Sequence, residues 1–358
     1  GVSNDIEAYE KLEKAMKNPG ELSLEDFNKY FTKTDLDLDK IPFIKYFKED
    51  GGFYLTSSII IACLNSVCNA SIHRMMLLDS SSAAVRIVPR HLYHIYRENL
   101  SHNRDTPVAI VLGAHPLIEV AASSSPPYGI FELGIAKALG SSGIVVKTPL
   151  YKIPVPVEAS IILEGILSRR ESIEGPFTDI LGLPDIQRKQ PVFELHSVYV
   201  SKKFPLQYHA IIPSFSEHVL LMGFPREAQI YGIVRSVAPG VKSVRLTPGS
   251  GGWLHAIVSI NQSKPGEARN VGLAVITAHP SVKHVVVVDD DIDIDNPHMV
   301  EWAIATRVKG SEDIIILRGV RGSTLDPRSV NGIGDKVIID ATKPFNEPWD
   351  KYRRVGVP

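Results

Sequence analysis

The densest group of side chains that could do chemistry is an aspartate run that directly follows four valines. Five carboxylates lie between Asp289 and Asp295, and Asn296 and Pro297 follow them. The valines predict a buried strand, and α/β sheets place ligand sites at the carboxyl ends of their strands. Five carboxylates so close together cannot all be buried unless they have partners. Two interpretations remain open. Asp289 and Asp291 are metal ligands of a phosphoesterase, or the aspartates pair with basic groups beside a helix that Asn296 caps.

A second group of polar residues predicts a site for an anion, or for a hard cation that carries a phosphate. Asn69, Ser71 and His73 alternate along a predicted strand, so they share one face, and Arg74 lies on the other. The pair Arg90–His91 follows in the sequence. Amide, imidazole and guanidinium groups are suited to such ligands. The alternative interpretation is a set of unrelated polar residues on a strand.

Two single residues are further candidates. Glu217 lies at the predicted start of a helix, where it could donate a proton or simply complement the helix dipole. Lys336 follows a glycine turn, where it could bind a phosphate or lie on the surface. The sequence contains no GxGxxG, GxxxxGK[ST], HExxH or GxSxG motif, so dinucleotide, P-loop, zincin and α/β-hydrolase sites lack their signatures.

The surrounding elements predict a mixed α/β protein. Short β-like runs fill residues 53–200, with one helix over 130–139, and strands alternate with helices over 243–317. The uncharged stretch 55–72 holds too many polar residues for a membrane span and predicts a strand, a turn and a strand. The first fifty residues predict helices, with a capping box at 23–26.

Composition argues against several classes of protein. The chain of 358 residues has 39 Lys plus Arg against 40 Asp plus Glu, and a net charge of −1 does not favour nucleic-acid binding. Cys63 and Cys68 are too few for a disulfide scaffold. With no visible secretory leader, this cysteine content favours a reducing, cytoplasmic location without a membrane partner.

Short segments of the chain, taken in order, resemble the UbiD-like decarboxylases, which use prenylated FMN. The matching segments are residues 51–56 (GGFYLT), 69–74 (NASIHR), 155–156 (VP), 161–165 (IILEG), 174–177 (EGPF), 191–194 (PVFE), 208–209 (YH), 289–293 (DDDID) and 302–307 (WAIATR). The resemblance covers about residues 41–349. It implies a helical N-terminal region over 1–50, a central split β-barrel that binds the flavin over 51–235, and a C-terminal α/β domain over 236–358.

The resemblance also implies a reaction, which is the non-oxidative and reversible decarboxylation of an α,β-unsaturated or aromatic acid through a covalent adduct with prenylated FMN. By motif position, Arg74 corresponds to the catalytic arginine and Glu217 to the catalytic acid. The family usually pairs this arginine with a second carboxylate. Residues 211–213, a short distance upstream of Glu217, offer none.

The cofactor site is implied in the same way. The residues expected to contact the cofactor are Asn69, Ser71, Ile72, His73, Arg90, His91 and Lys336. Of these, Asn69 and His91 match ligands of a divalent metal, Mn²⁺ or Mg²⁺, with K⁺ also expected. Ile144 falls where the family has a third ligand, a glutamate, and isoleucine cannot coordinate a cation. Glu132 and Glu158 both remain candidates for that role.

The resemblance leaves the substrate open. An archaeal branch of the family acts on trans-anhydromevalonate 5-phosphate in isoprenoid biosynthesis, and this is the leading expectation. A hydroxybenzoate-type or quinone-precursor acid is the runner-up, and a non-catalytic flavin-binding or assembly protein is the third possibility. Expected partners are a flavin prenyltransferase and further copies of the chain, as a dimer or hexamer. Because family members are generally longer at both ends, the chain is expected to be a trimmed member.

Overall fold

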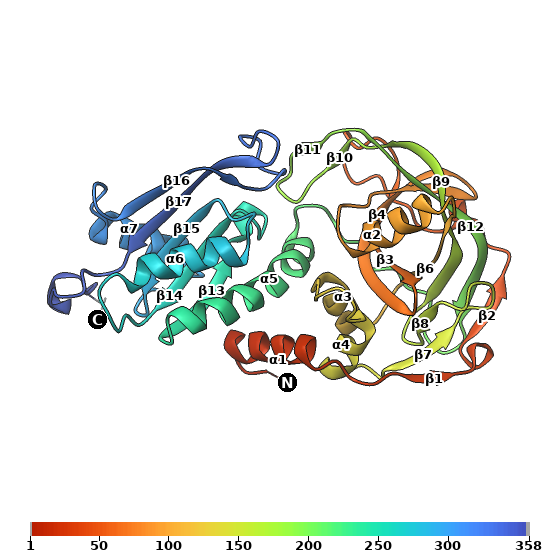
Figure 1. Cartoon of the computed structure of the whole chain (residues 1–358), viewed down its shortest axis with the longest axis horizontal. Coiled ribbons are helices and arrows are strands. Elements are labelled where there is room, and N and C mark those ends of the chain that lie inside the picture. The colour runs from red at the N-terminus through yellow and green to blue at the C-terminus, as the bar shows by residue number, and fades with distance from the viewer. Residues whose placement is uncertain (1, 356–358) are drawn as a thin grey trace. The chain divides into compact units, whose positions relative to one another are not determined.

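The computed structural model describes residues 2–355, which divide into two compact units. The first unit consists of residues 14–221, and the second combines the N-terminal residues up to 13 with the residues from 222 onward. The first unit contains a β-barrel and the second an open α/β sheet (Figure 1). The predicted fold class, a β-barrel domain with a C-terminal α/β domain, is confirmed.

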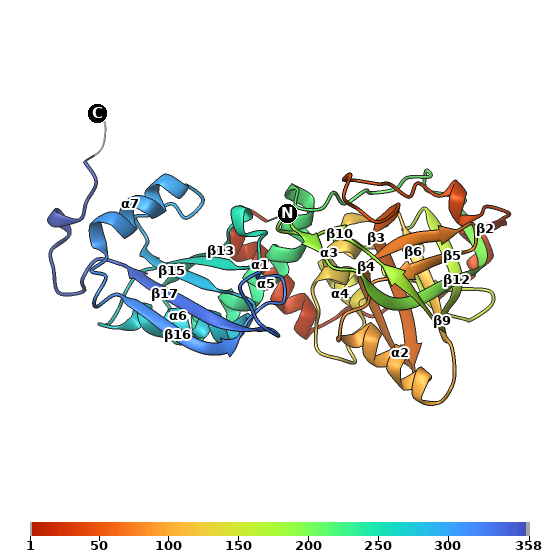
Figure 2. The ribbon, with the colours of Figure 1, turned by 90° about the horizontal axis from the view of Figure 1, so that it is seen from above.

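The barrel of the first unit is built from six antiparallel strands. They are β3 (Tyr54–Leu64), β4 (Val67–Asp79), β5 (Ser82–Val85), β6 (Thr106–Leu112), β9 (Ile161–Glu174) and β12 (Arg188–Ser201). Their order is β12-β5-β4-β3-β6-β9, and the long pairing of β9 with β12 closes the ring, as Figure 2 shows from above. A further strand, β2 (Phe31–Thr34), pairs with β12. The barrel core consists of aliphatic side chains such as Ile60, Val108 and Leu163, all fully buried.

Gly165 shows why the barrel needs a residue without a side chain in β9. A Cβ atom at this position would lie 2.0 Å from the carbonyl oxygen of Glu194 and 2.8 Å from the ring of Phe193, both in β12. Any larger residue would push the two closing strands apart. The glycine of the IILEG segment is therefore a requirement of barrel closure.

The predicted strand, turn and strand over residues 55–72 are confirmed as the hairpin of β3 and β4. Asn65 and Ser66 form its turn with positive φ angles, a conformation that suits a tight hairpin. Cys63 and Cys68 face each other across this hairpin and form a disulfide. The sequence did not predict this bond, because the pairing depends on the register of the hairpin.

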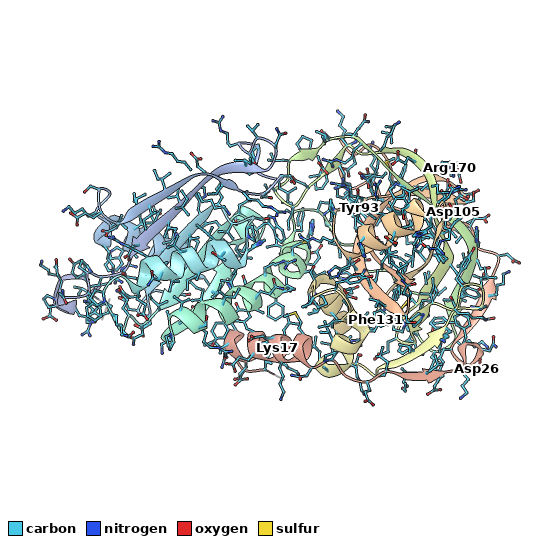
Figure 3. The ribbon with its side chains drawn as sticks, viewed as in Figure 1. Lys17, Asp26, Tyr93, Asp105, Phe131 and Arg170 are labelled. Atoms are coloured by element: carbon cyan, nitrogen blue, oxygen red, sulfur yellow. A yellow bond between two sulfur atoms is a disulfide. The ribbon has the colours of Figure 1, made fainter. Side chains whose placement is uncertain are left out.

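Smaller elements surround the barrel. They are the helices α2 (His91–Ser101), α3 (Pro116–Ser123) and α4 (Glu132–Leu139), the 3-10 turns η1 (Phe27–Lys29) and η2 (Leu38–Lys40), and the short strands β1 (Ser23–Glu25), β7 (Ile144–Lys147), β8 (Pro154–Pro156), β10 (Phe177–Thr178) and β11 (Pro184–Asp185). Strands β1, β7 and β8 form one small sheet, and β10 pairs with β11. Figure 3 draws the side chains of these elements and of the barrel, and it labels Tyr93 of α2.

The prediction of a helical region over residues 1–50 is wrong beyond its first part. Only α1 (Asp5–Lys17) is an α-helix in this stretch. Residues 23–26 are not a capping box, because Ser23–Glu25 is a strand that pairs in parallel with residues 144–146 of β7. Backbone pairing with a distant segment thus overrides a local helix signal.

The second unit is a five-stranded sheet with helices. Its strands are β13 (Val241–Leu246), β14 (His255–Ile260), β15 (His284–Asp289), β16 (Ile314–Arg321) and β17 (Ile333–Ala341), and its other elements are α6 (Glu267–Ala278), α7 (Pro297–Arg307), η3 (Pro248–Ser250) and η4 (Trp349–Lys351). The strand order is β13-β14-β15-β17-β16, with β14, β15 and β17 parallel. The partly parallel sheet agrees with the prediction from residues 243–317.

Two helices have residues in both units. Helix α5 (Ser216–Val237) begins in the first unit and continues into the second. Within the second unit, Tyr9 of α1 donates a hydrogen bond to the main chain of Val244, and its hydroxyl also contacts Glu227 of α5. In the part of the chain that the structure describes, no helix is both long enough and apolar enough to cross a membrane.

Candidate active site

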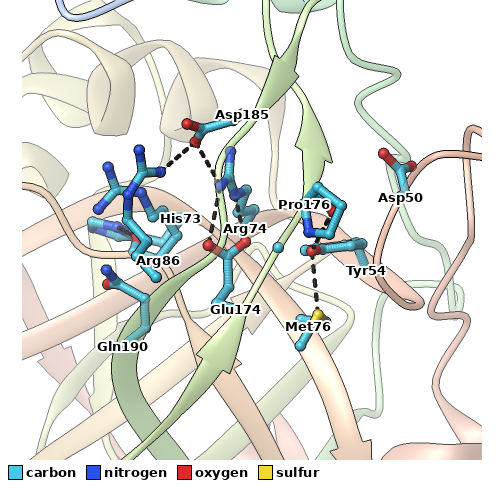
Figure 4. Close-up of polar contacts among 12 residues, drawn as sticks. Asp50, Tyr54, His73, Arg74, Met76, Arg86, Glu174, Pro176, Asp185 and Gln190 are labelled. Atoms are coloured by element: carbon cyan, nitrogen blue, oxygen red, sulfur yellow. Dashed lines mark hydrogen bonds and ion pairs between the residues drawn. The ribbon is translucent and has the colours of Figure 1, made fainter.

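Arg74, on β4, is the centre of an ion-pair cluster in the first unit (Figure 4). Its Nε and Nη2 atoms donate to the two carboxylate oxygens of Glu174 at 2.8 and 3.1 Å, and Nη2 also donates to Asp185 at 2.9 Å. The ring of Phe177 lies 4.5 Å from the guanidinium carbon. The Glu174 side chain is fully buried, whereas 15% of the Arg74 side chain is exposed. The cluster is thus fixed on one side and accessible on the other.

The partners of Arg74 come from the segment that joins β9 to β12. Glu174 is the last residue of β9, and Phe177 and Asp185 lie in the two-stranded β10–β11 hairpin. Asp50 holds this hairpin, because its carboxylate accepts hydrogen bonds from the amide and hydroxyl of Thr178. Barrel closure therefore brings Arg74 to carboxylates a hundred residues further along the chain.

Two more arginines belong to this cluster. Arg188, the first residue of β12, donates to the same Asp185 oxygen at 2.6 Å. Arg86 follows β5, and its side chain lies beside His73 and the Arg74 pair in Figure 4. Within residues 2–355, Arg86 forms no ion pair, and its one side-chain hydrogen bond goes to the carbonyl of Ile87 at 3.1 Å.

Asp179 is a third carboxylate near Arg74. It is buried, and one of its oxygens accepts hydrogen bonds from the amides of Leu181 and Leu183 at 2.8 and 3.0 Å. Burial raises the pKa of Asp179, and this effect outweighs those hydrogen bonds. A carboxyl group in this state keeps its proton to a higher pH than an ordinary aspartate.

Glu217 is placed by the first turn of α5. Its Oε1 atom accepts a hydrogen bond from the amide of Ile212 at 2.9 Å, and the side chain is half-buried. The neighbouring His218 accepts from the amide of Ser214, and burial lowers the pKa of His218 to about 4, with Arg74 adding a smaller electrostatic effect. Glu217 and His218 are therefore fixed by the loop that precedes the helix.

Three hydroxyl groups lie near Glu217. The hydroxyls of Tyr46 and Thr56 are 2.9 Å apart, and the Tyr208 hydroxyl accepts a hydrogen bond from the amide of Thr56 at 2.8 Å. The pKa of Tyr46 is raised, first by burial and also by Tyr208 and Glu217. Next in the chain, His209 hydrogen-bonds to the buried Glu119 at 2.8 Å. These groups form a polar surface beside the candidate acid.

The predicted polar face of β4 is confirmed. Asn69, Ser71 and His73 are connected by side-chain hydrogen bonds, and the Ser71 hydroxyl lies 2.8 Å from Nε2 of His73. Burial lowers the pKa of His73 to about 4, so this histidine is neutral near pH 7. Its Nδ1 atom lies 3.0 Å from the carbonyl oxygen of Arg86.

The structure places Glu132, rather than Ile144, beside Asn69. The Oε2 atom of Glu132 accepts a hydrogen bond from the amide of Ala70 at 2.7 Å. With the Asn69 amide assigned so that both of its polar atoms are satisfied, Nδ2 lies 3.3 Å from Glu132 Oε1. Glu132 is 2% exposed and forms no ion pair with any described residue. Burial raises its pKa to about 8.

The other residues considered for the third ligand lie elsewhere. Ile144 begins β7 and pairs with Ser23. Glu158 accepts hydrogen bonds from the amide and hydroxyl of Ser142 at 3.0 and 2.8 Å. Of the two glutamates left open by the sequence, only Glu132 is in contact with Asn69.

His91 and Arg90 lie at the start of α2. The rings of His91 and His94 both meet the Tyr128 ring edge-on, with centroids 5.4 and 5.1 Å away. Arg90 donates to the Ser125 hydroxyl at 3.1 Å. Among residues 2–355, no three His, Cys, Asp or Glu side chains gather in a way that could hold a metal ion.

Lys336 belongs to the second unit, on β17. Its ammonium group donates to the carbonyl of Pro280, and the residue is 2% exposed. Burial lowers the pKa of Lys336 to about 8. The interpretation of Lys336 as a surface lysine is therefore wrong.

The aspartate run of the second unit is a structural element. Arg307, whose side chain is fully buried, bonds to Asp289 at 2.8 Å and to Asp291 at 2.6 Å. Asn296 caps α7 by accepting a hydrogen bond from the amide of His298, as predicted. The two aspartates proposed as phosphoesterase ligands are thus already paired with a cation.

Sequence reasoning missed four residues of the Arg74 cluster, namely Arg86, Glu174, Asp185 and Arg188. Glu174 stands in the EGPF segment, so the resemblance marked its position but not its role. Asp185 lies in the short strand β11 and Arg188 begins β12, and neither belongs to one of the segments that match the family. No local signal could have connected them to Arg74, because the connection depends on barrel closure.

Comparison with known families identifies the class of protein. Residues 22–214 match the 3-octaprenyl-4-hydroxybenzoate carboxy-lyase Rift-related domain, and residues 219–341 match the C-terminal domain of the same carboxy-lyase. A barrel that carries an arginine–carboxylate cluster, followed by an α/β unit, agrees with these matches. The chain belongs to the UbiD family and is a decarboxylase.

Individual relatives narrow the comparison. The anhydromevalonate phosphate decarboxylase of Aeropyrum pernix is 44% identical over 365 residues, which cover 100% of this chain and 81% of that protein. The enzyme of the same name from Methanothermobacter thermautotrophicus is 40% identical over 355 residues, covering 98% of this chain and 83% of that protein. Gallate decarboxylase of Lactiplantibacillus plantarum is more distant, at 29% identity over 86% of this chain and 68% of that enzyme.

Solved structures agree with the fold. The UbiD-class enzyme HmfF from Pelotomaculum thermopropionicum, in complex with FMN, superposes with a TM-score of 0.93 at 36% identity, over 98% of this chain and 80% of that chain. An evolved dimeric form of HmfF in complex with prenylated FMN gives a TM-score of 0.88 at 33% identity, over 99% and 80% of the two chains.

Proposed function

We propose that the protein decarboxylates trans-anhydromevalonate 5-phosphate, a step of isoprenoid biosynthesis, with prenylated FMN as its cofactor. The observation that carries this proposal is the 44% identity, over the whole chain, to an anhydromevalonate phosphate decarboxylase. The Arg74 cluster supports it from the chemical side, because a partly exposed arginine in a fixed carboxylate frame can bind the carboxylate of an acid substrate.

The residues of the first unit fit a flavin cofactor. We propose that Ser71, Ile72 and His73 on β4, together with Arg90 and His91 at the start of α2, hold it. The hydrogen-bonded polar face of β4 and the Arg90 guanidinium, whose one described hydrogen bond goes to Ser125, provide donors for such a group. When bound, prenylated FMN supplies the electron sink for loss of carbon dioxide.

We propose a divalent cation, Mn²⁺ or Mg²⁺, near Asn69, with K⁺ as a second ion of the same site. Glu132 supports this because it is a buried carboxylate without any cationic partner among residues 2–355, beside the amide of Asn69. Carboxylate and amide oxygens are hard ligands. His91 would complete the site from α2, and Glu132 takes the role that Ile144 cannot fill.

In this proposal the protein itself contributes orientation and proton transfer. Arg74 binds and orients the substrate carboxylate, while Glu174 and Asp185 keep its guanidinium in place. Glu217 returns a proton to the carbon that loses carbon dioxide. Because Oε1 of Glu217 is engaged by the amide of Ile212, Oε2 is the oxygen that carries this proton. The buried Asp179, with its raised pKa, is the second candidate donor.

The test of the proposed function is a substrate panel. Protein reconstituted with prenylated FMN is incubated with trans-anhydromevalonate 5-phosphate, with the same acid lacking its phosphate, and with gallate and hydroxybenzoates, and carbon dioxide release is measured. We expect the phosphorylated acid to give the highest kcat/KM. A preference for an aromatic acid would replace the proposed substrate, and no turnover of any acid would favour the non-catalytic alternative.

The metal proposal has its own test. Reconstituted wild-type protein, Glu132→Gln and Glu158→Gln are dialysed against limiting Mn²⁺, and bound manganese and flavin are measured by mass spectrometry and absorbance. We expect about a 10- to 100-fold weaker metal affinity for Glu132→Gln and no change for Glu158→Gln, whose carboxylate contacts Ser142 instead. Equal metal binding by all three proteins would contradict the role of Glu132.

The remaining expectations are proposals of the same kind. A flavin prenyltransferase is the proposed partner, and co-expression with one should raise the prenylated FMN content of the purified protein. A homodimer or homohexamer is proposed, and light scattering gives its mass. The cytoplasmic location also stays a proposal, and the bonded Cys63–Cys68 pair does not support it.

A further inference from the structure

One cation of the Arg74 cluster has no ion pair among the described residues. Arg74, Arg86 and Arg188 face the two carboxylates of Glu174 and Asp185, and both carboxylates already bond to Arg74. Arg188 shares Asp185 with Arg74, which leaves Arg86 without an ion pair among residues 2–355. A half-buried cation without an ion pair, beside a carboxylate-binding arginine, calls for a second anion.

Arg86 is a cation with most of its donors unused. A guanidinium has five N–H donors, and the described structure uses one of them, for the carbonyl of Ile87. The residue is half-buried, and its pKa is lowered, first by burial and then by repulsion from Arg188 and Arg74. His73 cannot compensate for the charge, because it is neutral and carries no negative group.

The backbone of Arg86 is fixed on both sides. Its amide donates to the carbonyl of Arg74 at 3.1 Å, and its own carbonyl lies 3.0 Å from Nδ1 of His73. The next amide, of Ile87, donates to the side chain of Gln190 at 2.9 Å. The unpaired guanidinium is therefore presented from a rigid position between β4 and β12, which is a property of binding sites rather than of loose surface arginines.

We propose that Arg86, assisted by Arg188, binds a second anionic group of the substrate, a phosphate monoester, next to the carboxylate bound by Arg74. This inference rests on the proposed function and adds the residues that select a phosphorylated acid over an unphosphorylated one. The planar guanidinium matches the geometry of a phosphate and can donate to two of its oxygens.

The phosphate of the cofactor is the other possible source of this anion, and position argues against it. Asn69 and Glu132, where we place the divalent cation that would carry the cofactor phosphate, lie at the other end of the polar face of β4. Five residues separate Asn69 from Arg74, which corresponds to about 17 Å along a strand. Arg86 pairs with the Arg74 end, so it lies with the carboxylate site.

The experiment compares one substitution on two substrates. Wild-type protein, Arg86→Gln and the control Arg170→Gln are loaded with prenylated FMN, and kcat and KM are measured for trans-anhydromevalonate 5-phosphate and for the same acid without phosphate. Arg170 is matched to Arg86 in charge, lies on β9, and makes only an exposed ion pair with Glu194; Figure 3 labels it.

For Arg86→Gln we expect KM for the phosphorylated acid to rise about 100-fold, with kcat within about threefold of wild type. We expect KM for the unphosphorylated acid to stay unchanged, and Arg170→Gln to match wild type on both. Arg188→Gln should give a smaller rise, because its charge is shared with Asp185. If Arg86→Gln does not fold, Arg86→Lys replaces it, with an expected rise in KM of about 10-fold.

Three results would overturn the inference. Equal losses of kcat/KM on both substrates would mean that Arg86 acts by positioning Arg74. A drop in bound flavin per protein would assign Arg86 to the cofactor phosphate. Unchanged kinetics would show that the phosphate binds elsewhere. All three leave the proposed function intact if wild-type protein prefers the phosphorylated acid, whereas a wild-type protein without this preference would overturn both.

Discussion

Each unit of the molecule contains a mostly buried arginine that bonds to two carboxylates beside an aromatic ring. In the first unit, Arg74 bonds to Glu174 and Asp185 and lies 4.5 Å from the Phe177 ring centroid. In the second unit, Arg307 bonds to Asp289 and Asp291, with the rings of Trp302 and Trp349 at 5.2 and 5.6 Å. The two clusters contain the same types of residue. They differ in the solvent exposure of the arginine and in whether an unpaired arginine lies beside it.

The Arg307 cluster is closed and the Arg74 cluster is open. The Arg307 side chain is fully buried, and Asp289 also accepts a hydrogen bond from the amide of Lys343. Arg74 keeps 15% of its side chain exposed, and the unpaired Arg86 lies beside it. An arginine whose partners are all internal holds the fold together, whereas one that leaves positive charge available can bind a ligand.

The largest expected effect is on turnover, from Arg74→Lys. Lysine keeps the charge but cannot donate in parallel to Glu174 and a substrate carboxylate, so we expect kcat/KM to fall by about 10³-fold or more. Steady-state decarboxylation assays measure the loss, and a thermal melt checks the fold. A kcat/KM within tenfold of wild type would show that Arg74 has no essential role in the reaction.

Arg307→Met should act on stability instead. It leaves Asp289 buried without its cation, and breaking a buried pair in this way costs about 3–5 kcal/mol. Urea unfolding measures this change in the free energy of unfolding, and kcat per folded molecule should stay near that of wild type. The control is Arg235→Met, which removes only partly exposed pairs with Glu10 and Glu13 and should cost less than about 1 kcal/mol.

The two candidate proton donors near Arg74 should differ in effect. For Glu217→Gln we expect kcat to fall by about 10²–10³-fold, because an amide cannot donate a proton to the carbon that loses carbon dioxide. For Asp179→Asn we expect kcat to fall by only about tenfold. The reverse result would make Asp179 the donor.

The smallest effect concerns the pH dependence of stability near Arg74. Burial lowers the pKa of His218 to about 4, so the folded protein favours the neutral form. The stabilisation is complete above the ordinary histidine pKa near 6.5 and is lost as pH falls from about 6.5 to about 4. His218→Asn can keep the hydrogen bond from Ser214, and it should reduce the slope of unfolding free energy against pH by up to about 1.4 kcal/mol per unit. An unchanged slope would mean that His218 is not protonated in this range.

Local pattern was enough to predict the elements that position the site. The hairpin of β3 and β4, the polar face that carries Asn69 and His73, and the cap at Asn296 follow from alternation and capping rules that act over a few residues. The order of the family segments then predicted the barrel. These predictions succeeded because their causes lie within one or two neighbouring elements.

Contacts over long sequence distances were not predictable in this way. The aspartate run is the densest group of ionisable residues in the sequence, yet its Asp289 is paired with Arg307. Arg74 instead pairs with Glu174, which the sequence marked only as part of a family segment. Glu132 meets Ala70 because α4 packs near β4, which no spacing indicates. The strand at residues 23–25 likewise depends on a partner more than a hundred residues later.

The β10–β11 segment has a consequence for how this enzyme could be altered. Glu174, Phe177, Asp179, Asp185 and Arg188 all lie between the end of β9 and the start of β12, and Asp50 and the strands on either side hold both ends of this segment. One contiguous stretch of gene therefore encodes nearly all the partners of Arg74. Exchanging residues 174–188 between relatives that act on different acids would therefore exchange these partners of Arg74 together. The other strands of the barrel would keep their sequences.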